Sequence, residues 1–588
     1  MDRTGIIVVT ICVILLFLTW PEMPQQPQQP QPVTTSTNAV GTNVVQQPGL
    51  PATTTQPSNP GSKPPIELES EKLVTLETED SVYTFTSAGG LKSVGLNHHE
   101  AKPCSSTNQA DVIHLNHGVD LPVFSIAGLD DSEFEISSDD NLVTMVSTNQ
   151  AGIRISKRFS ADTNYLLHTS ITLENTKNEP VALNTRKMTL GTAMPLQQNS
   201  QYPVWGTQWH NGEDLEEIDE AWFANRTLGC FPGTPRTHFR SPPQSPINWV
   251  GIHNRFFAMT TMPKTPLPGA NVLSHKTTHR MLNDIPTEGQ YIHHTGVLAM
   301  LELPQGVLEP GKQVTHEFTT YAGPKEYRTL VELGVENKNS LQSVMGFDGF
   351  FGFFARILLR SMNGLNGFGL SYAWSIIAIT IIIKVLFWPL TKASTVSMKR
   401  MSAYQPQMGE IREKYKSDPQ KMNKKMMEFM REHKINPMGG CLPILIQLPV
   451  FFGFFTMLRS AVELRGAEFL WICDLSESDT VAHIFGFPIN PMPMLMAVTM
   501  LVQARLTPTS PTMDPMQQKM MKYMPLIFIV ILYNFSSGLT LYWTVQNMLS
   551  ILQTKLTRNI VVDVPDANTA NAALAKPIKA KPKNKRKK

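Results

Sequence analysis

Cysteine is scarce in this chain of 588 residues, and no two of its five cysteines have the CxxC spacing of a zinc or redox site. Cys12 and Cys441 lie in apolar segments, whereas Cys104 and Cys230 share a polar region. The second pair could form a disulfide if that region is extracytoplasmic, although two unpaired buried thiols fit at least as well. The spacing therefore predicts no thiolate metal site.

The motifs of common enzymes are also missing. The polar region lacks a glycine-rich phosphate loop, an HExxH zinc motif and a GxSxG serine elbow, and the chain shows no nucleotide site. His98, His99 and Glu100 could bind a metal, but adjacent histidines on a strand point to opposite faces, which favours a solvated turn. The acidic run at 213–220 lacks the spacing of a calcium loop and is interpreted as a solvated loop. We predict a protein that is not an enzyme and uses no metal or cofactor.

Long apolar runs are what the chain does have, mostly in its C-terminal third. Six runs approach the ~20 residues that a helix needs to span a bilayer, and they cover residues 4–20, 369–391, 441–460, 491–506, 523–537 and 539–557. The last two could instead form a re-entrant hairpin. The runs predict a polytopic α-helical membrane protein with six transmembrane helices.

Positive charge predicts how these helices are oriented. Residues 392–434 hold eleven Lys or Arg, whereas residues 461–490 hold one, and the stretch from Lys555 to the end holds ten against two acids. Because Lys and Arg collect on the cytoplasmic side of a membrane, we expect both termini in the cytoplasm and residues 461–490 outside it.

The N-terminal region is predicted to tether a domain outside the cytoplasm. Residues 1–20 are interpreted as a transmembrane anchor; a cleaved signal peptide is the rival interpretation, but no small-x-small cleavage site follows the apolar core. Residues 21–63, rich in Pro, Gln and Thr, are expected to be a disordered linker.

Strand signals fill the next region, residues 64–322. Apolar and polar residues alternate in KLVTLET, SVYTFTS, NLVTMVS, GIRISKRFS and YLLHTSITLEN, with turn residues between these segments. Many short strands at this spacing predict a large β-sandwich domain. The connector at 323–368 contains a phenylalanine-rich amphipathic helix, expected either to lie in the membrane interface or to belong to the core of the β domain.

The basic loop at 392–436 is predicted to be a cytoplasmic helical hairpin. Met401 and Met408 lie on a heptad seam of its first arm, and Met422 and Met426 lie on the returning arm after Asp418-Pro419. Methionine adapts to varied apolar partners, so these four side chains are candidates for substrate contact. The alternative is that they bury against each other.

One charge stands inside an apolar run. Lys384 lies in SIIAITIIIKVLFWPL, and Thr380, Lys384, Trp388 and Thr391 form one helical stripe. Polar side chains that would share a wet cavity with this stripe occur on the other core spans, namely Gln447, Gln503, Asn534 and Gln546. The alternative is that Lys384 snorkels to the cytoplasmic edge of the membrane.

Four motifs in order resemble the YidC family of membrane protein insertases: WPLTKASTVSMKRM from Trp388, INPMGGCLPILIQLPVFFGFFTMLRSAVELRGAEFLWICDLS from Ile435, DPMQQKMMKYMP from Asp514 and SSGLTLYW from Ser536. The resemblance covers about residues 345–558, and the preceding anchor, linker and β domain match the layout of Gram-negative members.

The resemblance implies a five-helix core, residues 369–558, around a hydrophilic groove open to the cytoplasm and to lipid. It implies a groove cation, usually arginine, at the position of Lys384, and a groove-lining aromatic at Trp543. The expected function is insertion of nascent membrane proteins into the bacterial inner membrane, alone or with the Sec translocon, with the β domain in the periplasm.

The sequence also allows other functions and partners. A solute or ion transporter with a periplasmic sensing domain is the alternative, but no inverted repeat supports it. An anchored external sugar-binding sensor would leave the five core spans unexplained. The basic tail at 559–588 could bind ribosomal RNA or membrane lipids, or have no partner, and no DNA binding is expected.

Overall fold

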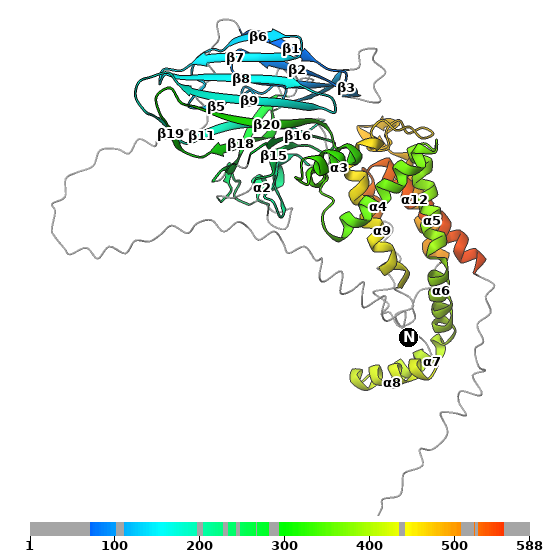
Figure 1. The fold of residues 1–588 in the computed structure, drawn as a ribbon. Coiled ribbons are helices and arrows are strands. Elements are labelled where there is room, and N and C mark those ends of the chain that lie inside the picture. Colours follow the sequence, from blue (N-terminus) through cyan, green and yellow to red (C-terminus); the bar gives the residue numbers. More distant parts are fainter. Residues whose placement is uncertain are drawn as a thin grey trace, which may run out of the picture. The chain divides into compact units, whose positions relative to one another are not determined.

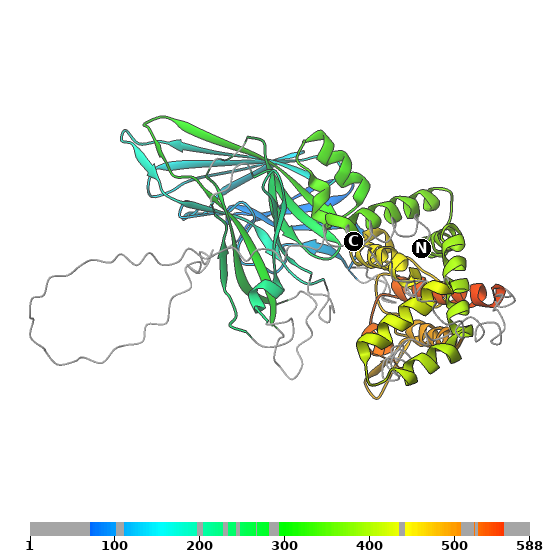
Figure 2. The same cartoon turned by 90° about the horizontal axis from the view of Figure 1, so that it is seen from below.

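The computed structural model describes residues 71–101, 111–196, 204–226, 233–242, 247–265, 267, 269–280, 293–433, 442–506, 523 and 527–557. They fall into a β unit, within Val8–Phe350 and Ser460–Val462, and a helical unit from Phe351 onward. Figures 1 and 2 show both units from two directions. The predicted anchor, linker and basic tail lie outside the described residues, as do Cys104 and Cys230. Cys473 is the only cysteine among the described residues, and it is disulfide-bonded.

The β unit is built around a nine-stranded antiparallel sheet. In spatial order its strands are β13 (Leu215–Asp219), β12 (Gly206–His210), β15 (Trp249–His253), β16 (Phe257–Pro263), β20 (Gln313–Pro324), β9 (Leu166–Asn175), β8 (Ile153–Ala161), β7 (Leu142–Thr148) and β6 (Glu135–Asp139). The long strands β7, β8 and β9 run side by side (Figure 1). Side chains of β8 alternate between buried and exposed, as a half-buried strand requires.

Two smaller sheets complete the core. One has the order β14 (His238–Arg240), β17 (Asn271–Arg280), β18 (His293–Leu303), β11 (Arg186–Ala193) and β5 (Ile126–Ala127). The other has β1 (Leu73–Glu77), β2 (Ser81–Thr86), β3 (Gly90–Glu100) and β4 (Val112–Leu115), and β10 (Val181–Leu183) pairs with β19 (Gly306–Leu308). Buried apolar residues from all three large sheets form one continuous core. The predicted β-rich domain is therefore confirmed, and the five quoted segments form β1, β2, β7, β8 and β9.

Two interpretations in the β unit were wrong. His98 and His99 belong to the end of β3 and not to a turn. The acidic run is a loop only at Glu213 and Asp214: the rest of it forms β13 and then α2 (Glu220–Ala224), whose N-cap Asp219 accepts a hydrogen bond from the Trp222 amide at 2.8 Å. These residues are ordered by cross-strand pairing with β12, although their charge alone suggested a solvated loop. The described residues contain no group of three or more potential metal ligands.

The segment after the last long strand is helical: α3 (Tyr327–Glu336), a short 3₁₀ turn (Leu341–Met345) and α4 (Gly349–Gly367). The helical unit then contains α5 (Tyr372–Leu386), α6 (Trp388–Ala403), α7 (Gln405–Lys414), α8 (Pro419–Glu432), α9 (Leu442–Ser460), α10 (Pro491–Leu506) and α12 (Ser537–Leu556). A short hairpin, β21 (Ala482–Ile484) and β22 (Phe487–Ile489), precedes α10.

The apolar run at 369–391 is not one straight helix. It breaks at Phe387, where α5 ends, and α6 begins with Pro389 in its first turn, a position that proline favours. Together α5 and α6 have the length and composition of a span, with a bend of 59° between them. Among the described residues no single helix is both long enough and apolar enough to cross a membrane. The count of six transmembrane helices stays a prediction.

Helices α7 and α8 pack against each other, and α6 leads to them from α5 (Figure 1). The predicted turn is present: Asp418 caps α8, with its side chain accepting from the Lys421 amide at 3.0 Å. The first arm is divided at Tyr404, because Pro406 begins a new helix. Met401, Tyr404, Met408, Met426, Phe429 and Met430 form a buried cluster between the arms.

Candidate functional site

Lys384 is the only charged residue of α5 and lies two residues before the end of that helix. Its side chain is half-buried, and Nζ donates a hydrogen bond of 2.8 Å to Oγ of Ser550 on α12. Among the described residues this hydroxyl is its only polar partner. An ammonium carries three donors. Lys384 therefore keeps donors for an anionic group that would enter from elsewhere.

The bond to Ser550 is one rung of a polar seam between α5–α6 and α12. We define this polar seam by three contacts: Lys384 to Ser550, Gln553 Nε2 to Thr391 Oγ1, and Lys399 Nζ to the Thr557 carbonyl at 2.6 Å. On α12, Gln546, Ser550, Gln553 and Thr557 follow at i, i+4, i+7 and i+11, so they share one helix face. The seam crosses the break at Phe387 and ties both helices to α12.

The structure places three predicted groove residues as follows. Thr380 is buried one turn before Lys384, and its hydroxyl donates to the Ile376 carbonyl of its own helix at 2.7 Å. Gln447 on α9 and Gln503 on α10 are both half-buried. Asn547 of α12 donates to Thr499 Oγ1 of α10 at 3.2 Å, so α12 also makes a polar contact with α10.

Asn534 does not lie near Lys384. It is exposed and precedes α12. Its Oδ1 lies 3.4 Å from Nδ2 of Asn490, the residue before α10. Fourteen residues of helix separate the Ser536 cap from Ser550, about 21 Å at 1.5 Å per residue. Asn534 therefore belongs to the opposite end of the core from Lys384, and we leave it out of the groove.

Trp543 lies in an aromatic and methionine-rich cluster. It is half-buried on α12, with ring centroids 4.7 Å from Phe451 of α9 and 5.4 Å from Phe528. It also packs against the buried cluster formed by Met496, Met500 and Leu532. Trp543 precedes Gln546 and Ser550 by three and seven residues, so it lies on the same face of α12 as the polar seam, about two turns nearer the start of that helix.

The hairpin methionines are mostly inside the hairpin. Met401, Met408 and Met426 are buried in the cluster between the arms, whereas Met422 is half-buried. The exposed methionine of α8 is Met427, which is not among the four predicted contact residues. This placement favours mutual burial over direct substrate contact for the first three. Separation of the two arms would have to precede any such contact.

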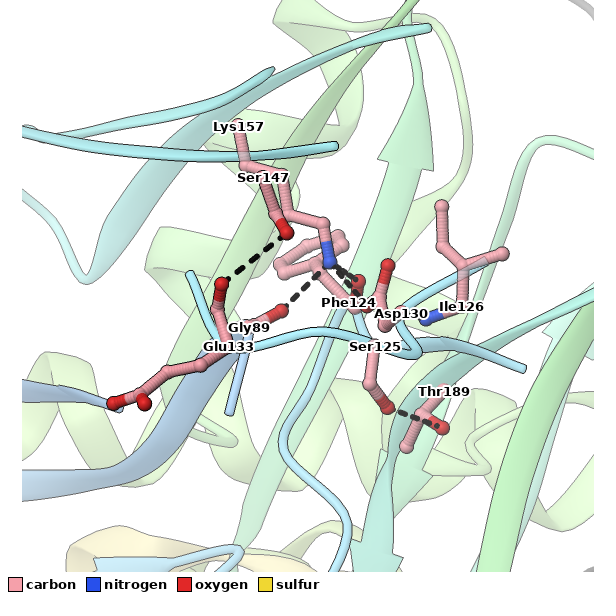
Figure 3. A network of polar contacts seen from close by, with 9 residues as sticks. All are labelled: Gly89, Phe124, Ser125, Ile126, Asp130, Glu133, Ser147, Lys157 and Thr189. Carbon is pink, nitrogen blue, oxygen red and sulfur yellow. Dashed lines mark hydrogen bonds and ion pairs between the residues drawn. The ribbon is translucent and has the colours of Figure 1, made fainter. Parts of the chain in front are cut away.

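A buried charge in the β unit serves the fold. Lys157 of β8 is completely buried, and Nζ contacts Asp130 Oδ2 at 2.5 Å, the Gly89 carbonyl at 2.7 Å and the Phe124 carbonyl at 2.9 Å (Figure 3). All three donors are thereby used. Burial lowers the pKa of Lys157 and raises that of Asp130. Because no face of the pair is open to a ligand, we assign it a structural role.

A second polar cluster crosses the nine-stranded sheet. Lys325 Nζ lies 3.0 Å from Nδ1 of buried His253, and His253 Nε2 lies 2.9 Å from Oε1 of Glu217. Since an ammonium can only donate, Nδ1 accepts and Nε2 carries the proton that faces Glu217. Burial would raise the pKa of Glu217, but His253 and Lys325 lower it to about 2. Burial and the charge of Lys325 lower the pKa of His253.

Replacing Glu217 with glutamine is expected to destabilise the protein at neutral pH but not in acid. A carboxyl whose pKa falls on folding, here from 4.5 to about 2, stabilises above the unfolded value and loses that contribution as pH falls through the folded one. The gap in unfolding temperature between parent and Glu217→Gln chains, followed by tryptophan fluorescence in detergent, should close between pH 4.5 and about 2. The exposed Glu213→Gln variant is the control, and a gap that widens in acid would contradict the assignment.

Comparison with known proteins decides what the two units belong to. Residues 364–563 match the family model described as "60Kd inner membrane protein", and residues 118–361 match "YidC periplasmic domain". The membrane protein insertase YidC of Geobacter sulfurreducens is 32% identical over 491 residues, which cover 80% of this chain and 83% of the relative. The chain belongs to the YidC family. YidC proteins are membrane protein insertases, and the family places the β unit in the periplasm and the helical unit in the inner membrane.

Other YidC matches differ in extent. The insertase YidC of Cupriavidus necator is 40% identical over 306 residues, and this match spans 52% of the chain and half of the relative's length. A crystal structure titled "Active YidC insertase crystal structure with the first transmembrane domain resolved" is 20% identical, with 83% of this chain and 93% of that one covered at a TM-score of 0.33. The family assignment rests on the sequence relatives.

Proposed function

We propose that the chain inserts nascent membrane proteins through a wet groove between α5, α9, α10 and α12, with Lys384 as its cation. One observation carries this: a half-buried lysine on a membrane helix has a single neutral hydroxyl as its polar partner among the described residues. Such a charge costs about 3 kcal/mol at a helix centre by insertion scales, so residues of this kind usually line cavities. Gln447 of α9, Gln503 of α10 and Thr380, one turn before Lys384 on α5, add further polar groups.

The energetic problem is the polar external tail of the substrate. Crossing hydrocarbon leaves its backbone groups unsatisfied, at several kcal/mol for each group. Helix α10 has 16 residues, or about 24 Å, against a hydrocarbon thickness of about 30 Å. Short helices thin the bilayer around them, and a groove of partial depth shortens the dry path further. Partition of the substrate's apolar helix into lipid then completes the transfer without a nucleotide.

Ser550 is proposed as the resting partner of Lys384. A hydroxyl accepts from the ammonium in the empty groove, and a substrate carboxylate replaces it as a charged acceptor, so that both partners of the new hydrogen bond carry a charge. A neutral partner holds the lysine in place without neutralising it. Ser550 would therefore set how readily Lys384 binds an acidic tail.

The remaining topology follows the charge distribution. We propose six spans with both termini in the cytoplasm, and a cytoplasmic hairpin of α7 and α8 whose outer face carries lysines such as Lys421, Lys424 and Lys425. The Sec translocon, the ribosome and anionic lipid are its candidate partners, the last two through the basic tail and this face. Membership of the family favours insertion over the transporter alternative.

The function is tested by expressing the chain in bacterial cells depleted of their own insertase. The readout is protease accessibility of the external tail of a small single-span test protein, with equal chain levels confirmed by blot. Restored accessibility supports the proposal. Continued protection of the tail, with the chain present in the membrane, contradicts it.

Changing Ser550 to aspartate is expected to block the groove from inside. The new carboxylate would pair with Lys384 permanently, so insertion of a test protein with an acidic tail should fall by about tenfold, the equivalent of about 1.4 kcal/mol. Ser550→Asn is the matched control, because it has nearly the same shape without the charge, and it should stay within about twofold of the parent. Equal losses in both variants would mean that Ser550 acts only through packing.

A further inference from the structure

The loop between α9 and α10 ends in an apolar hairpin that protrudes from the core. In the two-stranded hairpin β21–β22, Ile484, Phe485 and Phe487 are 55%, 105% and 57% exposed, and Val481 beside it is 54% exposed. The sequence from Thr480 to Ala504 contains no Asp, Glu, Lys or Arg. Exposed apolar clusters of this kind on a soluble surface mark a contact with another molecule or with a membrane.

The tip has a backbone conformation that phenylalanine disfavours. Phe485 and Gly486 have φ of +51° and +80°, and Ile484 pairs with Phe487 across this two-residue turn. Such turns favour Asn-Gly, because asparagine tolerates positive φ and bulky residues do not. A fully exposed phenylalanine at this position gains nothing from packing within the chain. Its presence indicates that the ring is used outside the fold.

The base of the hairpin is held rigidly. Tyr533 donates from its hydroxyl to the Pro488 carbonyl at 2.7 Å, and Asn490 donates to the Tyr533 carbonyl at 2.9 Å. Thr480 donates to Asn490 Oδ1 at 2.7 Å, which closes the two ends of the hairpin on each other. Asp479 accepts from the first turn of α10, at the Met492 amide, at 2.6 Å. The apolar tip therefore has a fixed position relative to α10.

The surface is continuous with one that faces lipid. One residue, Asn490, separates β22 from α10, and the exposed side chains of α10 include Met494, Leu495, Val498 and Val502. These belong to a membrane helix of an inner-membrane protein, so the hairpin stands where that helix leaves the bilayer. An uncharged segment with exposed phenylalanine and isoleucine side chains at this level matches the boundary of headgroups and acyl chains, into which apolar side chains of this kind insert.

We propose that the β21–β22 hairpin inserts its tip, Ile484, Phe485 and Phe487, into the outer-leaflet interface of the inner membrane. The side of the membrane rests on the topology stated under the proposed function. The hairpin would fix the outer ends of α10 and of the helix that precedes Tyr533 against the bilayer surface. Substrates leaving into lipid would then meet a core whose outer boundary does not move.

The test places an environment-sensitive fluorescent amino acid at position 485 of the full chain by amber suppression. The purified chain is reconstituted in vesicles of phosphatidylethanolamine and phosphatidylglycerol, with or without lipid that carries a nitroxide near the headgroup. Fluorescence at 485 should be quenched at least about threefold more than at Glu468, an exposed position in the same loop. No quenching at 485, or equal quenching at both positions, would overturn the proposal.

A second variant keeps the turn and removes the anchor. Phe485→Asn suits the positive φ, so the hairpin should still fold, while a probe at Ile484 should lose most of its lipid quenching. The lipid contact is refuted if the probe emission is blue-shifted but nitroxide lipid does not quench it. If this blue shift also disappears when the chain is diluted into more lipid, the tip contacts a second copy of the chain. Because no substrate is present, this readout is independent of whether the proposed groove works.

Discussion

Replacing Lys384 with glutamate is expected to lower insertion of a single-span test protein with an acidic external tail by at least about tenfold. Two unit charges 4 Å apart interact by about 4 kcal/mol at an effective dielectric of 20, and desolvation offsets part of this. A hydrogen bond to a charged group is worth about 1.5–3 kcal/mol net, which corresponds to a tenfold to hundredfold change. Alanine removes this attraction and glutamate turns it into repulsion, so the loss should increase in that order.

The measurement is protease accessibility of the tail in cells depleted of their own insertase, with three comparisons. Lys384→Arg keeps the charge and should insert normally. Lys392→Glu makes the same charge change at an exposed position eight residues further on, and should have little effect. A test protein with a neutral tail should respond less to every Lys384 variant.

The opposite result would also be informative. Equal insertion by all Lys384 variants would mean that the lysine snorkels to the membrane edge, as its position two residues before the end of α5 permits. Groove polarity and the short helices would then account for insertion alone. If the Ser550→Asp variant also inserts the test protein normally, the polar seam takes no part in insertion.

The β unit was largely predictable because its strands alternate in sequence. The period of two in β7, β8 and β9 is visible without any partner strand, since one face of each is buried. Residues 215–219 were not recognised because their acids suggested solvent. Their strand forms by pairing with β12 in a local hairpin, and the acidic side chains concealed the strand pattern.

The polar seam was predictable only where charge made a residue unusual. Lys384 stands out in an apolar run, whereas Ser550 does not, because serine on a membrane helix can satisfy itself on its own backbone, as Ser550 also does with Gln546 at 2.8 Å. Asn534 was grouped with Lys384 because polarity alone says nothing about depth along a helix. The break at Phe387 was missed although Pro389 marks it, because the apolar run continues across it.

Replacing Lys157 with methionine is expected to destabilise the periplasmic domain by about 3–5 kcal/mol. Methionine fills a similar volume but leaves Asp130 as an unpaired charge, with a side chain only 6% exposed, and removes the donor to the Gly89 and Phe124 carbonyls. These groups link β8 to the turn before β3 and to the segment before β5, so the loss should spread over both.

Amide hydrogen exchange of the full chain in detergent would localise this loss. Strands β2, β3 and β8 should exchange faster in Lys157→Met, while α5 and α12 keep their protection, because the change lies in the β unit. Arg158→Met is the control, since Arg158 is the next residue on β8 and its side chain is exposed. If both variants exchange alike, the buried pair contributes no more than a surface charge. A loss confined to Lys157→Met instead means that the domain depends on one buried cation that no substrate contacts.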